Sequence, residues 1–387
     1  MSKLLVFNPD HDLALASGTP NYTAPPNATV IANDLAHLLC WSNTNDVVVS
    51  NEKCVDAYRL LNGGCSTTSW KQLDVYEMVE PWGWNESIAH KLRREHVPTH
   101  LIPSESLLQE WRNNAHRRMA AKLAECLMNH DVLMPNPAIE LFTIEDLEQF
   151  VNQHHQVVFK APWSGSGRGL MWCNGELTPQ VRNRCLKLLT TQGSVMGEVR
   201  QVVIQDFALE FFKPHDGNAM FKGYSVFNTS NGVYKQNIVG SQTYLESIVT
   251  RYVSKTLLSH IIEQSIEFIN QNFPTYMGCL GIDMFIYECQ GCIGINPAVE
   301  INLRNTMGNV ALELANRWLD PQVVGTYSID YYPNSHDLLN DHYLRSKTTP
   351  LEIKEGKIVG GYLSLCPINE TTHYRARIDI VANRKGL

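Results

Sequence analysis

Short apolar runs separated by longer polar connections organise the first hundred residues. A buried strand is predicted at Lys3–Asn8, and it leads into the polar turn Asn8–Asp12. Further strands are predicted at Thr29–Ala32, Asp46–Val49 and His100–Ile102. Strands that alternate with longer connections are typical of a parallel α/β layer, which we therefore expect at the start of the chain.

Helical and strand-like patterns alternate in the next segment. One helix is predicted from Glu105 to Asn129 on helix propensity, and another over Thr143–Gln153, where Thr143 is a suitable N-cap before two acidic residues. Two strands, Val157–Lys160 and Leu170–Cys173, flank a glycine-rich segment. That segment is therefore predicted to connect two strands.

In the second half of the chain, the alternation of predicted helices and strands is clearest. The predicted elements are a helix at residues 178–191, a strand at Val202–Gln205, a hairpin over Phe221–Ile238, a helix at Ser254–Phe273, a strand pair over Ile282–Asn302, a helix at Val310–Trp318 and a strand at Val359–Leu365. The polar stretch Asp330–Asp341 is predicted to be a loop.

Composition places the chain among folded, water-soluble proteins of two or three domains. Its 387 residues, 44% hydrophobic and 18% charged, exceed what one core usually holds. A net charge of −7 without a basic stripe argues against nucleic acid as a partner. There is no apolar run of about 18 residues and no signal-peptide pattern, so we expect no membrane span and a cytoplasmic location.

The ten cysteines are scattered, which favours reduced thiols over a disulfide framework. Cys289 and Cys292 form the one close pair, and they flank Gln290-Gly291, a predicted hairpin turn. No second pair or histidine at ligand spacing follows, so we do not expect zinc there.

A six-residue segment after the strand Val157–Lys160 is rich in glycine. It consists of Ser164, Gly165, Ser166, Gly167, Arg168 and Gly169. Glycines let backbone amides approach an anion closely, although a flexible surface turn has the same composition. No helix start follows the glycines and no Gly-Lys-Ser/Thr is present, so neither a dinucleotide-binding motif nor a P-loop fits. A glycine flap over phosphates remains, with Lys160 directed at the α- or β-phosphate.

A second polar group lies on the predicted strand pair near residue 300. Glu300 and Asn302 are two residues apart and so face the same side of a strand, with Asp283 on the partner strand. Carboxylate and amide oxygens suit Mg²⁺ shared with nucleotide phosphates. Arg304 continues the same face, where it would stabilise charge on a phosphoryl group. Solvent-facing strand residues would show the same alternation.

Taken in order, Lys160, the glycine flap, Asp283 and Glu300-x-Asn302-x-Arg304 resemble the ATP-grasp superfamily. The resemblance covers about residues 105–320. It implies an N-terminal α/β domain followed by an α+β ATP-grasp fold of two subdomains. The expected boundaries are 1–104 for the N-terminal domain, 105–200 for the subdomain with the flap, 201–325 for the subdomain with the metal strand, and 326–387 for a C-terminal extension.

The resemblance also implies cofactors and contacts. ATP with Mg²⁺, or with Mn²⁺ in its place, would lie between the subdomains, with its phosphates on the flap and Lys160. Adenine would lie against a linker strand, Val203–Ala208, where Gln205 and Ala208 offer hydrogen bonds, and Glu210 would contact the ribose. A further phosphate-binding cation is expected at the start of the earlier helix. Arg118 fits that place, with Arg117 as its close competitor.

The function that the resemblance implies is an ATP-dependent carboxylate-amine ligase working through an acyl phosphate. Its partners would be a small carboxylate and an amine, and a homodimer is compatible with the sequence. A small-molecule kinase and a non-catalytic ATP-binding module stay open, whereas the strand after the glycines disfavours an NAD-dependent oxidoreductase. The polar groups Asn8–Asp12 and Asn21–Thr23 either bind a substrate or form an Asx-rich turn.

Overall fold

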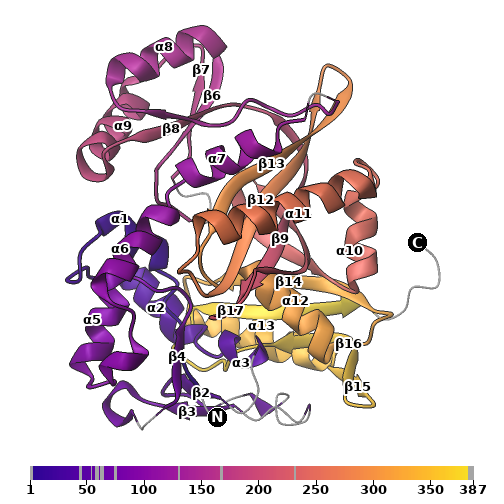
Figure 1. The fold of residues 1–387 in the computed structure, drawn as a ribbon. Coiled ribbons are helices and arrows are strands. Elements are labelled where there is room, and N and C mark those ends of the chain that lie inside the picture. The colour runs from indigo at the N-terminus through magenta and orange to yellow at the C-terminus, as the bar shows by residue number, and fades with distance from the viewer. Residues whose placement is uncertain are drawn as a thin grey trace.

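Three sheets make up the molecule in the computed structural model (Figure 1). It describes residues 3–42, 46–53, 55–56, 61, 65–73, 76–129, 131–165, 169–230 and 232–381. A small parallel sheet opens the chain, a small antiparallel sheet carries the start of the glycine-rich segment, and a nine-stranded sheet forms the body. The expected α/β layer followed by α+β units is confirmed.

The N-terminal layer is a four-stranded parallel sheet in the order β3-β2-β1-β4. Leu4 and Leu5 of the central strand are fully buried on opposite faces, as a parallel strand covered on both sides requires. Its elements are β1 Lys3–Val6, α1 His11–Ser17, α2 Pro26–Asp34, α3 Leu38–Ser42, β2 Val47–Val49, β3 Ser66–Thr68, a 3₁₀ turn Trp70–Gln72, β4 Met78–Pro81, α5 Glu86–Arg94, a 3₁₀ turn Thr99–Leu101 and α6 Glu105–Asn114.

The second sheet, in the order β5-β8-β6-β7, is antiparallel and has its own core with α8 and α9. These elements stand at the top of Figure 1, above α7. Their bounds are α7 Arg118–Leu127, β5 Ile139–Leu141, α8 Ile144–His154, β6 Gln156–Lys160, β7 Met171–Asn174, α9 Pro179–Gln192 and β8 Val195–Val199. Thr143 and Asp146 form a capping box that fixes the start of α8.

The large sheet runs β13-β12-β9-β10-β11-β14-β17-β16-β15. Its central strands are antiparallel, and α10, α11 and α12 pack against them. The bounds are β9 Val202–Lys213, β10 Met220–Ser230, β11 Val233–Val239, α10 Gln242–Val249, α11 Lys255–Asn272, β12 Gly278–Cys289, β13 Cys292–Asn302, α12 Met307–Trp318, β14 Val324–Tyr331, α13 Ser335–Thr348, β15 Glu352–Lys354, β16 Lys357–Ser364 and β17 Tyr374–Val381.

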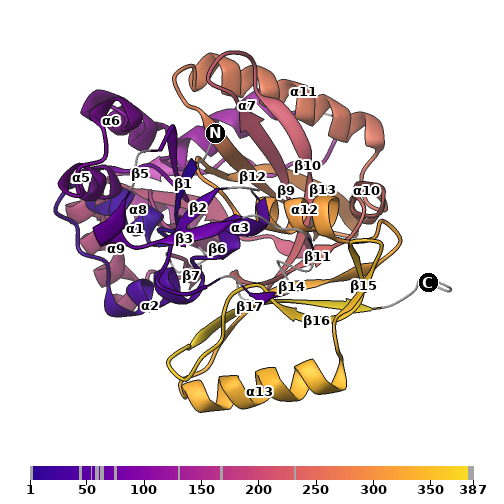
Figure 2. The same cartoon turned by 90° about the horizontal axis from the view of Figure 1, so that it is seen from below.

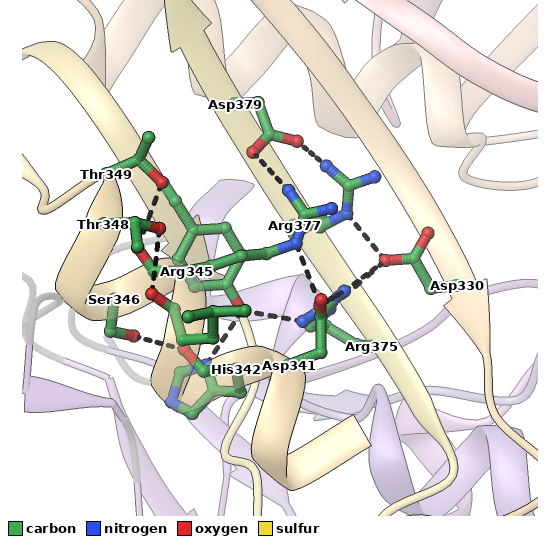
Figure 3. A network of polar contacts seen from close by, with 12 residues as sticks. Asp330, Asp341, His342, Arg345, Ser346, Thr348, Thr349, Arg375, Arg377 and Asp379 are labelled. Carbon is green, nitrogen blue, oxygen red and sulfur yellow. Dashed lines mark hydrogen bonds and ion pairs between the residues drawn. The ribbon is translucent and has the colours of Figure 1, made fainter. Parts of the chain in front are cut away.

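The C-terminal strands continue the large sheet, and α13 covers the face opposite α12 (Figure 2). Arg375 is fully buried beneath α13 and pairs with Asp330 and Asp341, each at 2.7 Å (Figure 3). Asp330 also accepts from Arg377, and Arg345 of α13 reaches Asp379. Alternating charges therefore join α13 to the sheet. No helix in the described ranges is long and apolar enough to cross a bilayer.

Four predicted elements are wrong. Thr29–Ala32 lies in helix α2, which Pro26 starts with its fixed φ. His100–Ile102 lies at a 3₁₀ turn after Pro98. Asp330–Asp341 contains the end of β14 and the start of α13, where one buried leucine leaves too weak an apolar period to detect. The predicted helix Glu105–Asn129 is two helices, α6 and α7, broken at residues 115–117.

Candidate active site

A cleft of about 1870 Å³ lies where the three sheets meet. Side chains of the N-terminal layer, of the small antiparallel sheet and of the large sheet all line it. The candidate residues from the sequence that line it are Lys160, Ser164, Gly165, Gly169, Ala208, Glu210, Asp283, Glu300, Asn302 and Arg304. The fold therefore brings together most of the candidate residues, although those in the cleft are spread over more than 140 residues of sequence.

Lys160 enters this cleft from the end of β6. The register pairs Val158 with Glu198 and Lys160 with Met196, so Lys160 and Glu198 share one face of the small sheet. Their Nζ and Oε2 atoms lie 2.7 Å apart and both side chains are largely buried. Glu198 was not a candidate, because a partner 38 residues away on another strand leaves no local pattern in the sequence.

The two neighbouring arginines at the start of α7 point differently. Arg118 is exposed and does not line the cleft, whereas Arg117 is 6% exposed and does. The backbone N–H of Arg117 donates to the carbonyl of Pro162, and the helix break there turns its side chain inward. The structure thus brings Arg117 into the cleft with the other candidates and leaves Arg118, the first choice, outside it.

Arg117 ties the glycine-rich segment to the carboxylates. Its Nε donates to the carbonyl of Ala161 at 3.0 Å, and its Nη2 donates to the carbonyl and hydroxyl of Ser164 at 3.0 and 3.2 Å. The same Nη2 lies 2.9 Å from Oε1 of Glu300. One guanidinium therefore contacts both halves of the predicted site.

Asp283 and Glu300 face each other across the β12–β13 hairpin. They are direct register partners, and Gly281 is paired with Asn302, so the three polar side chains share one face. The amide of Asn302 donates to Asp283. Burial, with Glu300 close by, raises the pKa of Asp283 to about 7, and burial likewise raises the pKa of Glu300 against the opposing effect of Arg117.

These three residues fit a metal shared with a ligand better than a closed protein site. Within the described ranges, no three His, Cys, Asp or Glu side chains converge on a common point. Two carboxylates and one amide supply hard oxygen atoms but leave positions for ligand oxygens, which is how Mg²⁺ is usually held beside phosphates. The two carboxylates, each only partly exposed, also lack enough cationic partners to keep their ordinary pKa values.

Arg304 follows β13 and meets the N-terminal layer. Its Nε and Nη2 donate to the two carboxylate oxygens of Asp12 at 3.1 and 3.0 Å. Burial would raise the pKa of Asp12, but Arg304, with smaller contributions from His11 and Arg117, holds it below its usual value. Asp12 was noted in the sequence only as part of a polar turn.

That polar turn divides into two kinds of residue. Asn8 exchanges hydrogen bonds with the backbone of Gly83, and His11 contacts the amide of Asn85 at 3.1 Å. Both are buried, and they hold the end of β1 and the start of α1 against the residues between β4 and α5. Asp10 and Asp12, in contrast, line the cleft. Part of the turn is therefore structural, and part borders the site.

Glu210 lies deep in the same cleft, 1% exposed. The hydroxyl of Thr306 is 2.9 Å from each of its carboxylate oxygens. Burial raises the pKa of Glu210 to about 8. A Cβ on Gly308 would lie 2.1 Å from Oε1 of Glu210, so that glycine leaves the space in which the carboxylate sits. The ribose contact that the resemblance implied for Glu210 stays a prediction.

The predicted linker strand Val203–Ala208 is a strand, and its contact with adenine stays a prediction. It lies inside β9 of the large sheet, and the connection between the two sheets is Arg200-Gln201. Ala208 lines the cleft, whereas the amide of Gln205 donates to the carbonyls of Asp206 and Phe227 and lies outside the lining. The side chains that line the cleft at the true connection are Glu198, Val199, Arg200, Gln201, Val202, Val203 and Ile204.

The glycine-rich segment is described in part. Ser164, Gly165 and Gly169 line the cleft, while Ser166, Gly167 and Arg168 fall outside the described residues. A Cβ on Gly165 would lie 2.0 Å from Oδ2 of Asp12, so only glycine lets the segment pass this close to the Asp12–Arg304 pair. The segment does connect antiparallel strands β6 and β7, as predicted.

Comparison with known proteins gives a structural match without a sequence match. No family model matches the chain, and no curated protein matches it by sequence. Among solved structures, the biotin carboxylase domain of Hydrogenobacter thermophilus 2-oxoglutarate carboxylase, a dimer with MgADP, ADP and bicarbonate, superposes with a TM-score of 0.55 at 11% identity. That alignment covers 99% of this chain and 86% of that one.

Two further structures match along nearly the whole chain. Carboxyaminoimidazole ribonucleotide synthase from Aspergillus clavatus, complexed with ATP, has a TM-score of 0.50 at 11% identity, with 98% and 93% of the two chains covered. Biotin carboxylase from Campylobacter jejuni, in a complex with β-γ-ATP, has a TM-score of 0.50 at 11% identity, with 99% and 88% covered. The three-sheet arrangement and these full-length matches together show that the chain has the ATP-grasp fold.

Proposed function

We propose that this protein is a Mg-ATP-dependent ligase that activates a small carboxylate as an acyl phosphate for attack by an amine. The observation that carries the proposal is one cleft in which Arg117, Lys160 and Arg304 lie around the carboxylate face of Asp283 and Glu300. Phosphoryl transfer needs cations that bind the phosphates, ligands that hold a metal ion, and a further positive charge at the reacting group. The fold supports the proposal, because the matched structures contain ADP or ATP.

The nucleotide would lie between the small and the large sheet. Arg117, Lys160 and the backbone amides of the glycine-rich segment would bind the phosphates, and the connection around Arg200-Gln201 would border the base. Asp283, Glu300 and Asn302 would hold Mg²⁺, or Mn²⁺ in its place. When bound, the metal would neutralise charge on the β- and γ-phosphates.

Catalysis would then depend mainly on how the protein positions the two substrates and the nucleotide. A carboxylate oxygen of the substrate attacks the γ-phosphorus and ADP leaves. The amine nitrogen next attacks the acyl carbon, loses a proton, and inorganic phosphate leaves. Arg304, held from one side by Asp12, would steady the negative charge of the acyl phosphate. Residues of this chain would contribute charge and orientation rather than a covalent nucleophile.

The wall of the cleft that the N-terminal layer forms indicates which kind of amine substrate would bind there. The residues that line it there are Pro9, Asp10, Asp12, Leu13, Ala16, Ala28, Ile31, Leu35 and Trp82. Among these described residues there is no lysine, arginine or histidine, so this wall is poorly suited to a phosphorylated substrate. An acceptor that carries an amine, and that binds in its unphosphorylated form, suits it better.

An ADP-release screen tests the proposal. Pools of amino acids, peptides and small carboxylates would be offered with Mg-ATP, and active pools resolved by mass spectrometry. A ligase gives a new amide together with ADP and phosphate. A phosphorylated product would instead establish the small-molecule kinase, and ATP binding without turnover in any pool would favour a regulatory module. The enzyme would be cytoplasmic. Size-exclusion chromatography would show whether it forms a homodimer.

A further inference from the structure

Each of the three cations proposed for phosphate or acyl-phosphate binding already has a carboxylate partner. Lys160 lies 2.7 Å from Glu198, Arg304 lies 3.0 Å from Asp12, and Arg117 lies 2.9 Å from Glu300. Two of these carboxylates have no other proposed role. Glu300 differs, because it is also a proposed metal ligand. The Arg117–Glu300 pair therefore joins the phosphate site to the metal site through one side chain.

The guanidinium of Arg117 is fixed independently of Glu300. The carbonyls of Ala161 and Ser164 accept from its Nε and Nη2 at 3.0 Å, and the Ser164 hydroxyl accepts at 3.2 Å. These are backbone contacts or contacts next to the backbone, and the side chain is buried. Loss of Glu300 as a partner would therefore leave the guanidinium in place, facing the cleft with its charge unpaired.

Glu300 cannot serve a metal ion and Arg117 equally well. A divalent ion bound to its carboxylate brings two positive charges close to a third, between side chains that are mostly buried. The repulsion is relieved if another anion takes over the guanidinium. A phosphate oxygen of the nucleotide is that anion, because the metal and the cation would then both face the same polyphosphate.

We infer that Glu300 is an exchangeable counter-ion: it neutralises Arg117 while the metal is absent, and releases it to the nucleotide when the metal binds. This inference rests on the proposed function and adds a binding rule to it. Without metal, a nucleotide meets Arg117 already paired and a carboxylate facing its phosphates. With metal, the same guanidinium is free. Metal and nucleotide therefore bind cooperatively, and the pair Arg117–Glu300 carries much of the coupling.

The test is calorimetric binding of ADP at pH 8, first with a chelator and then with Mg²⁺. Glu300→Gln removes the counter-ion and nearly preserves the shape of the side chain. We expect it to raise the metal-free affinity for ADP at least about fivefold, and to lose most of the enhancement that Mg²⁺ gives the wild type. Asp283→Asn is the matched control, because it removes the neighbouring carboxylate, which is more distant from Arg117 and forms no ion pair with it among the described residues. Its metal-free gain should stay below about twofold.

Variants of Arg117 test whether the gain in metal-free ADP affinity depends on this arginine. In Arg117→Met, or in Arg117→Gln if the methionine variant does not fold, Glu300→Gln should no longer raise the metal-free affinity. The inference is overturned if Glu300→Gln brings no gain, if Asp283→Asn gains as much, or if the gain persists without Arg117. Failure of the wild type to bind ADP even with Mg²⁺ would overturn the proposed function itself. The two failures are therefore distinguishable.

Discussion

Arg304 and Asp12 are 292 residues apart in sequence, yet two nitrogen atoms of the guanidinium contact the two oxygen atoms of the carboxylate at 3.0 and 3.1 Å. The pair connects α1 of the N-terminal layer to the residues that follow β13. Gly165 lies against the same carboxylate. Three segments of the cleft thus meet at one ion pair, which makes it a sensitive point for mutation.

Asp12→Asn should destabilise the protein by about 2–4 kcal/mol, because it leaves a largely buried guanidinium without its counter-charge. Urea unfolding of the single variants and of Asp12→Asn with Arg304→Gln would give a double-mutant cycle. We expect a coupling energy of about 1–3 kcal/mol. Additive effects of the two substitutions would show that the contact contributes little.

Lys160→Met should weaken the binding of MgADP about 10- to 100-fold, as expected for the loss of a charged contact to phosphate in a buried site. Arg118→Met is the matched control, since Arg118 is exposed and outside the cleft. It should change the affinity less than about twofold. The reverse order of the two effects would mean that the nucleotide lies elsewhere.

Metal binding should depend on pH through Asp283. Its pKa is raised to about 7 in the folded protein, so below that pH the carboxyl group is protonated and must lose a proton before it can bind a cation. We expect the affinity for Mn²⁺, followed by its paramagnetic signal, to fall by up to about tenfold per pH unit below pH 7. An affinity that stays constant between pH 6 and pH 8 would contradict this assignment.

Gly308→Ala should destabilise the protein although alanine is the better helix former. Gly308 lies in the first turn of α12, and a Cβ there would come within 2.1 Å of Glu210 and 2.4 Å of the Ser225 hydroxyl. We expect a loss of about 1–3 kcal/mol from overpacking. The loss should become smaller in a Glu210→Ala background. A stabilised Gly308→Ala protein would show that the carboxylate is not confined as described.

The sequence was informative wherever the chemistry followed a strand. The period of two placed Glu300 and Asn302 on one side of β13. The turn at Gln290-Gly291 sets the register only as far as the Phe285–Asn296 pair, and an irregularity between Asp283 and Phe285 then brings Asp283 opposite Glu300. Strands on both sides of the glycine-rich segment were likewise readable from β-branched and aromatic residues. Local pattern sufficed because neighbouring strands of a hairpin are close in sequence.

The rest of the site depends on contacts that no local pattern records. Arg117 and Arg118 are adjacent, and only the break between α6 and α7 decides which one points inward. Glu198 and Asp12 meet Lys160 and Arg304 through pairing of distant segments. The connection between the two sheets at Arg200-Gln201, in contrast, falls at the expected boundary between residues 200 and 201.

The most direct test of a Mg-ATP site between the two sheets is calorimetry of ATP binding with Mg²⁺ present. The account predicts one ATP per chain for the wild type, and binding weakened at least about tenfold in both Lys160→Ala and Glu300→Ala. Absence of binding in the wild type, or two alanine variants that bind like the wild type, would contradict it.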